Sequence, residues 1–364
     1  MKLTIDPSLF REALKYAATA ISPRPLTPIM AGVMLTAEDG RLRAFGADYE
    51  RQAAYTVDAN IETEGTVIVS ANLLTKAAAR LKNRADILVQ TTDDGLVVSQ
   101  GATVFKLNLM PVNEYPDLSA DAPAVGNVDG TALAHAIHAV EGAAFNDESH
   151  IVLVSLHLTS KGNELHLAAT DRYRLAVDLI EWAPGGGDDF EVILPIDWVR
   201  SMAKNVAGDT TLHAEIESGK VTRFGVTSGD YTTTTTVRQG SYPKILQLFG
   251  KVGKNTYTVQ REELLGALEA VSVMVERKQP IRLACSSSGV ITVDAGGEQG
   301  SSVAQIRTDN TIEFGTMFNP EFIIWALRAL DADQVRIVPN GTKPTHITPA
   351  TGNTQFLLMP VRES

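Results

Sequence analysis

The chain repeats one helical pattern three times. Residues 7–17 (PSLFREALKYA) align without a gap on residues 130–140 (GTALAHAIHAV) and 261–271 (REELLGALEAV). Apolar residues stand at the same places in each stretch, spaced as i, i+4 and i+7: Phe10, Leu14 and Ala17; Leu133, Ile137 and Val140; Leu264, Leu268 and Val271. This spacing predicts an α-helix with one buried face. In the first copy, Asp6 and Pro7 supply the cap and the first-turn proline that start a helix.

A second helical pattern recurs in the same way. Residues 70–81 (SANLLTKAAARL) match residues 195–206 (PIDWVRSMAKNV) and 319–330 (NPEFIIWALRAL). The period of both patterns is about 125 residues, the size of a small domain, whereas solenoid units run about 20 to 50 residues. The 364 residues are therefore expected to form three domains, at 1–120, 127–246 and 254–364.

Runs of alternating apolar and polar residues separate the two helices of each copy. They include residues 41–45, 164–168 and 290–293, and residues 231–236 are rich in β-branched threonine. Such runs predict strands with one face on a core. The expected fold class is α+β, with three tandem copies of a domain in which two helices pack on antiparallel sheets. Residues 117–127 and 245–254 are expected to be linkers, and the glycine run at 184–189 a hairpin tip.

The composition limits where the chain can work and what it can bind. Hydrophobic residues make up 44% and charged residues 21%, which is enough apolar material for real cores. No long apolar run and no leader-like start are present, so neither secretion nor membrane insertion is expected. The single cysteine, Cys285, fits a reducing cytoplasm and is expected to be buried. A net charge of −11 argues against nucleic-acid binding by overall basicity, although it permits a local basic surface.

Catalytic and metal-binding patterns are missing from the sequence. His135 and His138 could share a helix face, yet no carboxylate or thiolate partner follows at metal-site spacing. No phosphate-binding glycine loop, nucleophile elbow or zinc signature occurs. We therefore expect that the chain is not an enzyme and that it needs neither a cofactor nor a metal ion.

Basic residues gather in the second helix of two copies. Residues 70–84 include Lys76 and Arg80 and contain no acidic residue, and the matching helix of the second copy has Arg200 and Lys204. The members of each pair are four residues apart and are predicted to share a helix face. The residues alone leave two readings open: a solvated helix face, or a DNA-facing surface that contacts the phosphate backbone.

Four segments resemble one known family along the full length of the chain. They are residues 22–29 (SPRPLTPI), residues 169–176 (ATDRYRLA), Tyr242-Pro243 and the terminal Met359-Pro360-Val361-Arg362. The sequence is similar to the bacterial DNA polymerase III beta subunit, the replicative sliding clamp. The resemblance implies a head-to-tail homodimer that forms a ring of six domains around duplex DNA. The sequence repeat supports a dimer, because the first and third copies would each leave one unpaired sheet edge that a second chain can cover.

The resemblance also implies a pocket between the second and third domains that accepts a short peptide motif from partner proteins. The partners implied are the DNA polymerase III catalytic subunit, the clamp loader and repair proteins. Carried over by position, the pocket consists of Leu153, Thr170, Arg174, Leu175, Pro243, Leu248, Met359, Pro360, Val361 and Arg362. Apolar side chains with a few polar groups among them suit such a site.

On the DNA side, the resemblance implies contacts from Arg24, in the proline-flanked loop, and from Arg80 in the second helix. Three features depart from the family's pattern. Residues 146–150 (NDESH) are acidic where some relatives carry DNA contacts, and Gln247 and Lys278 replace an arginine and an aromatic residue near the pocket. The acidic segment argues against DNA contact by that loop, and the changes at Gln247 and Lys278 point to a different preference among partners.

The expected function is a non-enzymatic processivity factor, located in the cytoplasm at the nucleoid, which tethers a polymerase by enclosing double-stranded DNA. Two alternatives remain open. One is a specialised clamp of the same fold, either a second copy or a phage-type clamp, for instance one that is insensitive to a clamp inhibitor. The other is an enzyme acting on nucleic acid, for which no catalytic group can be assembled from this sequence. The third copy of the repeat argues against a clamp that is a trimer of two-domain chains.

Overall fold

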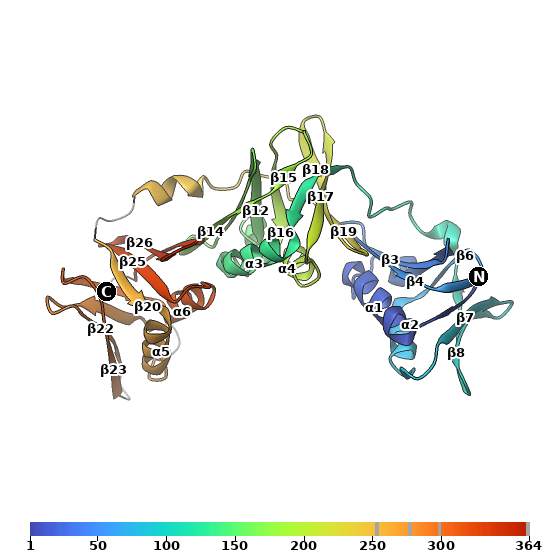
Figure 1. The fold of residues 1–364 in the computed structure, drawn as a ribbon, viewed down its shortest axis with the longest axis horizontal. Coiled ribbons are helices and arrows are strands. Elements are labelled where there is room, and N and C mark those ends of the chain that lie inside the picture. Colours follow the sequence, from blue (N-terminus) through green and yellow to red (C-terminus); the bar gives the residue numbers. More distant parts are fainter. Residues whose placement is uncertain (252–254, 276–278, 298–299, 362–364) are drawn as a thin grey trace. The chain divides into compact units, whose positions relative to one another are not determined.

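The computed structural model describes residues 1–251, 255–275, 279–297 and 300–361, and the chain divides into two compact units (Figure 1). The N-terminal unit consists of Met1–Thr131, Ala183–Asp188 and Lys204–Val237. The C-terminal unit consists of Ala132–Trp182, Asp189–Ala203 and Arg238–Ser364. The middle copy of the repeat therefore contributes one of its sheets to each unit. No helix in the described residues is long and apolar enough to cross a membrane.

The N-terminal unit contains two antiparallel sheets. The five-stranded sheet has the order β5 (Asn60–Thr63), β1 (Lys2–Ile5), β7 (Ile87–Thr92), β8 (Gly95–Gln100) and β9 (Thr103–Leu107). The ten-stranded sheet has the order β10 (Leu109–Met110), β6 (Gly65–Ser70), β2 (Gly32–Glu38), β3 (Arg41–Ala47), β4 (Arg51–Asp58), β19 (Tyr231–Thr236), β18 (Lys220–Ser228), β17 (Asp209–Glu217), β11 (Ala124–Asp129) and β15 (Ala183–Pro184). Helices α1 (Pro7–Ala17) and α2 (Ala71–Ala78) belong to this unit.

The C-terminal unit is built in the same way. Its eight-stranded sheet has the order β16 (Glu191–Pro195), β12 (Ser155–Lys161), β13 (Glu164–Thr170), β14 (Arg174–Glu181), β27 (Gln355–Leu358), β26 (Lys343–Pro349), β25 (Gln334–Asn340) and β20 (Tyr257–Gln260). Its four-stranded sheet has the order β23 (Gly300–Arg307), β22 (Val290–Gly297), β21 (Ile281–Cys285) and β24 (Phe314–Phe318). The helices are α3 (Gly130–Val140), which starts at the boundary between the units, α4 (Ile196–Ala203), α5 (Arg261–Ser272) and α6 (Pro320–Arg328).

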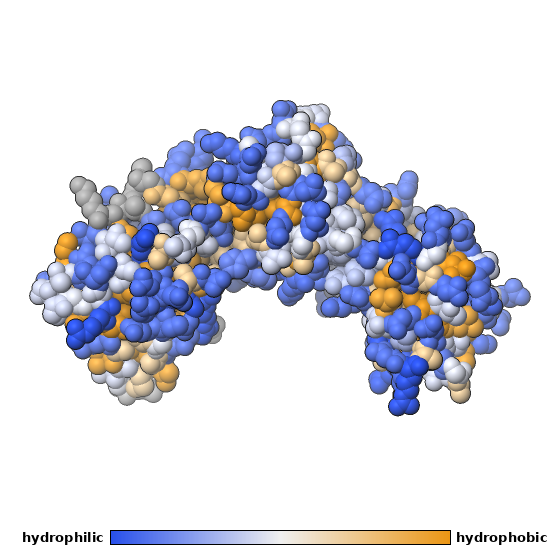
Figure 2. Space-filling model, viewed as in Figure 1, coloured by the Kyte–Doolittle hydropathy of each residue, from blue (hydrophilic) through white to orange (hydrophobic). Residues whose placement is uncertain are grey.

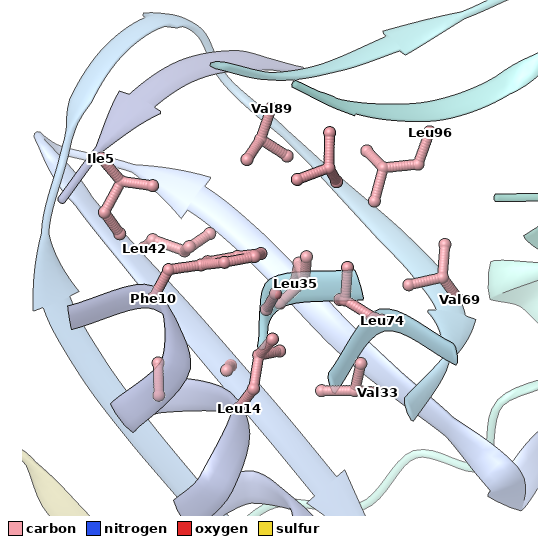
Figure 3. Close-up of a cluster of buried hydrophobic side chains, with 14 of the residues drawn as sticks. Ile5, Phe10, Leu14, Val33, Leu35, Leu42, Val69, Leu74, Val89 and Leu96 are labelled. Atoms are coloured by element: carbon pink, nitrogen blue, oxygen red, sulfur yellow. The ribbon is translucent and has the colours of Figure 1, made fainter. Parts of the chain in front are cut away.

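The first helix of each copy confirms the prediction from apolar spacing. In α1, the Asp6 side chain accepts hydrogen bonds from the backbone N–H of Ser8 at 2.7 Å and of Leu9 at 3.3 Å, as an N-cap should. Phe10 and Leu14 are 0% and 1% exposed, and they point into a cluster with Leu74 of α2 and with strand residues (Figure 3). Burial of these side chains holds the helices on the sheets.

The second helix of each copy is shorter than predicted. Helix α2 ends at Ala78, although the pattern predicted a helix over residues 70–81. The next turn is tighter, because the N–H of Arg80 bonds to the carbonyl of Ala77 at 3.0 Å and the N–H of Leu81 bonds to Ala78 at 3.2 Å. Leu81 is buried there, and Arg11 of α1 donates to its carbonyl at 3.3 Å. Tertiary contacts therefore end the helix before its sequence pattern does.

Three other local predictions need correction. The expected linker at 117–127 runs into a strand, because β11 begins at Ala124 and pairs with β17. In the expected linker at 245–254, Ile245–Lys251 forms a 3-10 helix, and residues 252–254 lie outside the described residues. The glycine run at 184–189 is no hairpin tip, because the strands on its two sides, β15 and β16, pair with β11 and β12 in different sheets.

The three copies share one strand arrangement. One group of four strands is ordered β6-β2-β3-β4, β16-β12-β13-β14 and β24-β21-β22-β23 in the successive copies. The other group is ordered β1-β7-β8-β9, β11-β17-β18-β19 and β20-β25-β26-β27. Successive copies join edge to edge: β4 of the first pairs with β19 of the second, and β14 of the second pairs with β27 of the third. We call these pairings the first and the second junction.

The two junctions carry different side chains on their two faces. On one face the first junction pairs Gln52 with Thr234, where the second junction pairs Leu175 with Leu357. On the opposite face the first junction has an aromatic cluster, in which Tyr16 of α1 stacks on Tyr55 at 4.4 Å and lies 5.1 Å from Tyr231. There the second junction has a polar pair, because Thr354 donates to the buried carboxylate of Asp178 at 3.0 Å.

Replacing Asp178 by asparagine should make the stability of the protein less dependent on pH. Burial raises the pKa of Asp178 above its ordinary value of 3.8. The folded protein therefore binds this proton more tightly than the unfolded chain, and stability falls as pH rises from 3.8 through the raised pKa. We expect Asp178→Asn to melt on the order of 2 to 4 °C above wild type near pH 7 and level with it near pH 3, in thermal unfolding followed by calorimetry.

The exposed Asp93 in the β7–β8 turn provides the matched control, since Asp93→Asn should leave the melting temperature unchanged at both pH values. An Asp178→Asn variant that is less stable than wild type near neutral pH would show that the charged carboxylate is favourable where it stands.

Candidate functional site

The segment 169–176 forms the tight turn between β13 and β14. The Asp171 carboxylate accepts the backbone N–H of Tyr173 at 2.9 Å and of Arg174 at 2.8 Å, and Arg174 Nε donates to its other oxygen at 2.9 Å. The Thr170 hydroxyl donates to the Arg174 carbonyl at 2.8 Å. Asp171 and Thr170 are both 5% exposed. The turn therefore fixes the Arg174 side chain at the Nε atom, because a charge-assisted hydrogen bond that is shielded from water is strong.

Two aromatic residues of α6 fix the other end of Arg174. Its guanidinium lies 4.5 Å from the ring centre of Phe322 and 5.1 Å from that of Trp325, within the range of a cation–π interaction. Trp325 also packs over Gly142, where an added Cβ would lie 2.0 Å from Trp325 Nε1, so only glycine fits. Sequence reasoning missed Phe322 and Trp325. Their three-residue spacing in the predicted helix at 319–330, which puts both on one face, was the available signal.

Leu175 belongs to a buried cluster whose residues come from both of the repeat copies that meet at the second junction. Leu175, Tyr242, Ile245 and Leu357 are each 4% to 6% exposed, and Val152 and Phe249 pack against them. The Tyr242 ring stacks on His157 with the centres 4.6 Å apart and the planes 5° from parallel, and burial raises the pKa of the Tyr242 hydroxyl. His157 in turn contacts Glu191 through Nε2 at 2.8 Å. The Tyr-Pro pair is thus anchored by its tyrosine, while Pro243 is exposed.

Apolar side chains lie exposed next to this cluster. Leu248 is 46% exposed, Met359 38% and Val361 39%, and Pro360 is half-buried. The backbone after β27 holds the last three, since the N–H of Met359 bonds to the carbonyl of Tyr173 at 2.8 Å and that of Val361 to Met317 at 2.8 Å. Arg362 lies outside the described residues. Folding therefore brings together Thr170 at the end of β13, Arg174 and Leu175 at the start of β14, and Met359 directly after β27.

Leu153 is buried next to Val152, which packs on the Leu175 cluster, and its backbone fixes the neighbouring acidic segment. Its N–H bonds to the carbonyl of His150 at 2.8 Å, and its carbonyl accepts from Phe145 at 2.9 Å. Within residues 146–150, Asp147 caps the turn, and hydrogen bonds from Ser149 lower the pKa of its carboxyl. Arg172, at a φ of 80°, places its guanidinium 3.0 Å from His150 Nε2. The carboxylate of Asp147 is thus used locally to hold the loop.

The basic residues named for DNA contact belong to several different elements. Arg24 is exposed in the loop before Pro28, and Lys76 is exposed on α2 (Ala71–Ala78). Arg80 and Lys204 follow the ends of α2 and α4, so the predicted sharing of one helix face by each pair is wrong. Figure 2 shows strongly hydrophilic residues projecting at the edge of the region that carries α1 and α2.

Arg200 of α4 is the most constrained of these cations. Its Nε lies 3.1 Å from a carboxylate oxygen of Glu141, and its Nη2 donates to the Glu141 carbonyl at 3.4 Å. Glu141 also contacts His138 at 3.4 Å. The charge of Arg200 is therefore partly balanced within the protein, unlike that of the exposed Arg24 and Lys76, for which the described structure shows no ion pair.

The described residues hold no group of three or more His, Cys, Asp or Glu side chains that could bind a metal ion. Cys285 is buried, as predicted, and its thiol lies 3.5 Å from the carbonyl oxygens of Ser286 and Asn310. Burial raises the pKa of this thiol. A raised pKa lowers the fraction of thiolate, the form in which cysteine attacks or binds metals.

Comparison with known proteins identifies the family. Models of the DNA polymerase III beta subunit match along the chain: the N-terminal domain at residues 1–119, the central domain at 127–244 and the C-terminal domain at 246–362. The chain therefore belongs to the DNA polymerase III beta subunit family, the sliding clamps, whose members are non-catalytic accessory subunits.

Individual relatives agree with this assignment. The beta sliding clamp of Streptomyces coelicolor is 33% identical over 380 residues, covering 100% of both chains. The beta sliding clamp homolog GriR of Streptomyces muensis is 28% identical over 376 residues, covering 100% of this chain and 99% of the relative. Among solved structures, the DnaN sliding clamp of Pseudomonas aeruginosa bound to griselimycin has a TM-score of 0.92 at 21% identity, with both chains covered in full.

Polar substitutions in the apolar group should weaken the binding of clamp-motif peptides. We expect Met359→Ser and Leu175→Ser each to weaken binding by about 2 kcal/mol, roughly 30-fold, because apolar anchors dominate such interfaces. Calorimetric titration of a peptide from a replicative polymerase measures the effect. Met359 is exposed, so its variant should keep the fold, whereas Leu175→Ser must first be shown to be folded.

Ile216 offers the matched control, since it is 55% exposed on β17 and belongs to the other unit. Ile216→Ser should bind the peptide as wild type does. Equal peptide affinity for wild type and a folded Met359→Ser, Leu175→Ser double variant would remove the site from this location.

Proposed function

We propose that this protein is a DNA sliding clamp, which encircles duplex DNA and tethers the replicative polymerase. The observation that carries the proposal is the edge-to-edge joining of repeated copies, which leaves matching edges at the two ends of the series. Family membership supports it independently. We also propose domain bounds at 1–120, 127–246 and 254–364, and a cytoplasmic location at the nucleoid, where a clamp finds its DNA.

The two ends of the series define how a second chain would bind. At the junctions, β4 pairs with β19 and β14 pairs with β27. The strand of the third copy that corresponds to β4 and β14 is β23, and the strand of the first copy that corresponds to β19 and β27 is β9. Each lies at the end of its sheet. We infer that β9 of one chain pairs with β23 of its partner, twice, which closes a head-to-tail ring.

Exposed apolar residues on and beside these strands support a dimer contact. Val104 on β9 is 54% exposed, and Val303 on β23 is 66% exposed. Val273, directly after α5, is 81% exposed, and Met274 is 40% exposed. Exposed hydrophobic strand edges are covered in stable proteins, either by charge or by a partner. A second copy of the chain covers both edges at once.

A charge on either edge strand should dissociate the dimer. We expect Val104→Asp and Val303→Asp to shift the protein from dimer to monomer at micromolar concentration in sedimentation velocity. The physical reason is the cost of burying an unpaired carboxylate beside the partner strand, at least about 2 kcal/mol. Val112→Asp is the control, because Val112 is 43% exposed but belongs to neither strand. A wild-type protein that is only monomeric, or trimeric, would contradict the proposed ring.

DNA would be held by enclosure, with modest help from charge. The chain has a net charge of −11, and the candidate contacts are Arg24, Lys76, Arg80, Arg200 and Lys204. Direct affinity should be weak and strongly dependent on salt, since each phosphate contact releases a counterion. A closed ring on circular DNA is not subject to that limit.

Retention on DNA should depend on the topology of the DNA. After loading onto a nicked circular plasmid, we expect the protein to remain bound at a salt concentration that strips ordinary DNA-binding proteins, and to leave once the plasmid is cut. Neutralising Arg24 and Arg80 should weaken direct binding and reduce its salt slope by about one per lost contact, with little effect on retention. Gel filtration of labelled protein with circular and linearised plasmid measures this. Equal retention on both forms would show that charge alone holds the protein.

Partner proteins would bind at the apolar group around Leu175 and Met359. We propose the DNA polymerase III catalytic subunit, the clamp loader and repair proteins as the partners, each through a short peptide. An apolar surface with Thr170 and Arg174 at its edge suits such a peptide. The solved clamp from Pseudomonas aeruginosa named above is bound to griselimycin.

A specialised clamp remains a second candidate, favoured by the similarity to GriR and by Gln247 in the place of an arginine. Lys278, the other departure noted in the sequence, lies outside the described residues. Replacing the host's replicative clamp by this chain alone separates the two readings. Sustained replication supports the main proposal, whereas growth only beside another clamp supports the specialised one.

A further inference from the structure

The first junction contains a counterpart of the peptide group at the second. Ala47, Arg51 and Gln52 stand where Thr170, Arg174 and Leu175 stand in the second copy, because β3 and β4 correspond to β13 and β14. The turn is also the same: Asp48 accepts the backbone N–H of Arg51 at 2.7 Å, as Asp171 accepts that of Arg174 at 2.8 Å. Strands β3 and β13 even share one burial pattern along their length.

The cores beneath the two junctions correspond as well. Phe45, Ala54, Ile68 and Tyr115 form the cluster under the first junction, where Ala168, Val177, Ile193 and Tyr242 form it under the second. Each tyrosine is followed by a proline and by the segment that leads to the next copy. Both junctions therefore offer the same framework on which a peptide surface could be built.

Side-chain chemistry separates them. At the first junction, Gln52 and Thr234 are 2% and 0% exposed, and the Thr234 hydroxyl donates to Gln52 Oε1 at 2.5 Å. Arg223 Nη2 donates to Thr234 Oγ1 at 2.8 Å and also to Gln52. At the second junction the matching pair is Leu175 and Leu357.

The same arginine holds the segment 116–121, which we call the first linker. Arg223 Nη2 donates to the carbonyl of Ser119 at 2.8 Å. Beside this bond, Ala120 is 0% exposed in the core cluster and Leu118 packs against it. Asp121 lies 3.6 Å from Arg43. By strand register, Pro344 occupies the place of Arg223 at the second junction and has no side-chain donor.

The apolar residues that stand exposed at the second junction have no such counterparts at the first. By register, Thr236 and Val237 correspond to Met359 and Pro360. Thr236 is polar and Val237 is 6% exposed, whereas Met359 is 38% exposed. The first junction therefore presents less apolar surface to a ligand. Both linkers pack against their junctions, Ala120 and Leu118 at the first and Ile245 and Phe249 at the second, and Arg223 holds the first linker in addition.

We propose that the first junction is a second peptide surface occupied by the chain's own first linker and locked by Arg223, so that each chain binds one partner peptide. The proposal rests on the proposed function of the second junction. Its ligand class is the same, a short peptide with apolar anchor residues. Arg223 is a positioning residue here, because it acts through the carbonyl of Ser119.

Converting the polar lock to apolar residues tests the proposal. The variant combines Gln52→Leu, Thr234→Val and Arg223→Met, which removes the three mutually bonded polar side chains together and leaves the carbonyl of the exposed Ser119 to bond to water. The probe is the polymerase-derived peptide used above, and native mass spectrometry counts the peptides bound per chain. We expect one for wild type and two for the triple variant. Adding Leu175→Ser to the triple variant should return the count to one, at the first junction.

Two further measurements keep the outcomes distinct. Arg223→Met alone should speed amide exchange in the first linker about tenfold, whether or not a peptide is bound. Arg41→Met is the control, because Arg41 pairs with Asp58 and Asp230 on the same sheet and its change should leave the linker unaffected. Unchanged exchange in Arg223→Met, or one peptide per chain in the folded triple variant, overturns the inference. Peptide binding to wild type that is insensitive to Leu175→Ser contradicts the proposed function of the second junction instead.

Discussion

Unpaired strand edges are the constraint on which the rest of this structure depends. A strand at the end of a sheet exposes backbone N–H and C=O groups that must find partners or stay in water. Each copy of the repeat ends one sheet in a strand of the β4 type and the other in a strand of the β19 type. The chain satisfies two such pairs internally, at β4–β19 and β14–β27. The remaining edges of these two types, β9 and β23, are the ones that a second chain would satisfy.

The side chains at each junction then decide what that junction can do. Tyr16, Tyr55 and Tyr231 pack one face of the first junction, and a buried polar group around Gln52 occupies the other. At the second junction the distribution is reversed, with Asp178 on one face and Leu175 on the other. A repeated backbone thus carries different chemistry at equivalent places: Met359 is exposed at the second junction, whereas its counterpart at the first, Thr236, is polar.

Local patterns predicted the helices, while long-range contacts decided the rest. The bounds of α1 and α3 followed from apolar spacing, because that signal lies within one helix. The end of α2 did not, since burial of Leu81 tightens the chain after Ala78. The pairing of β4 with β19 joins segments that are far apart in the sequence. The residue pattern of neither segment predicts it. At the candidate site, the resemblance pointed to Arg174, but its stacking on Phe322 and Trp325 required the fold.

Amide hydrogen exchange followed strand by strand tests the central claim most directly, which is that one kind of edge pairing joins all copies. In concentrated protein, we expect amides of β9 and β23 to be protected as those of β4 and β14 are. On dilution below the dissociation constant of the dimer, protection should vanish for the outward-facing amides of β9 and β23, those not bonded to β8 and β22, and persist in β4 and β14. Exchange at these outward-facing amides that is fast at every concentration, in a protein that is otherwise dimeric, would contradict the account.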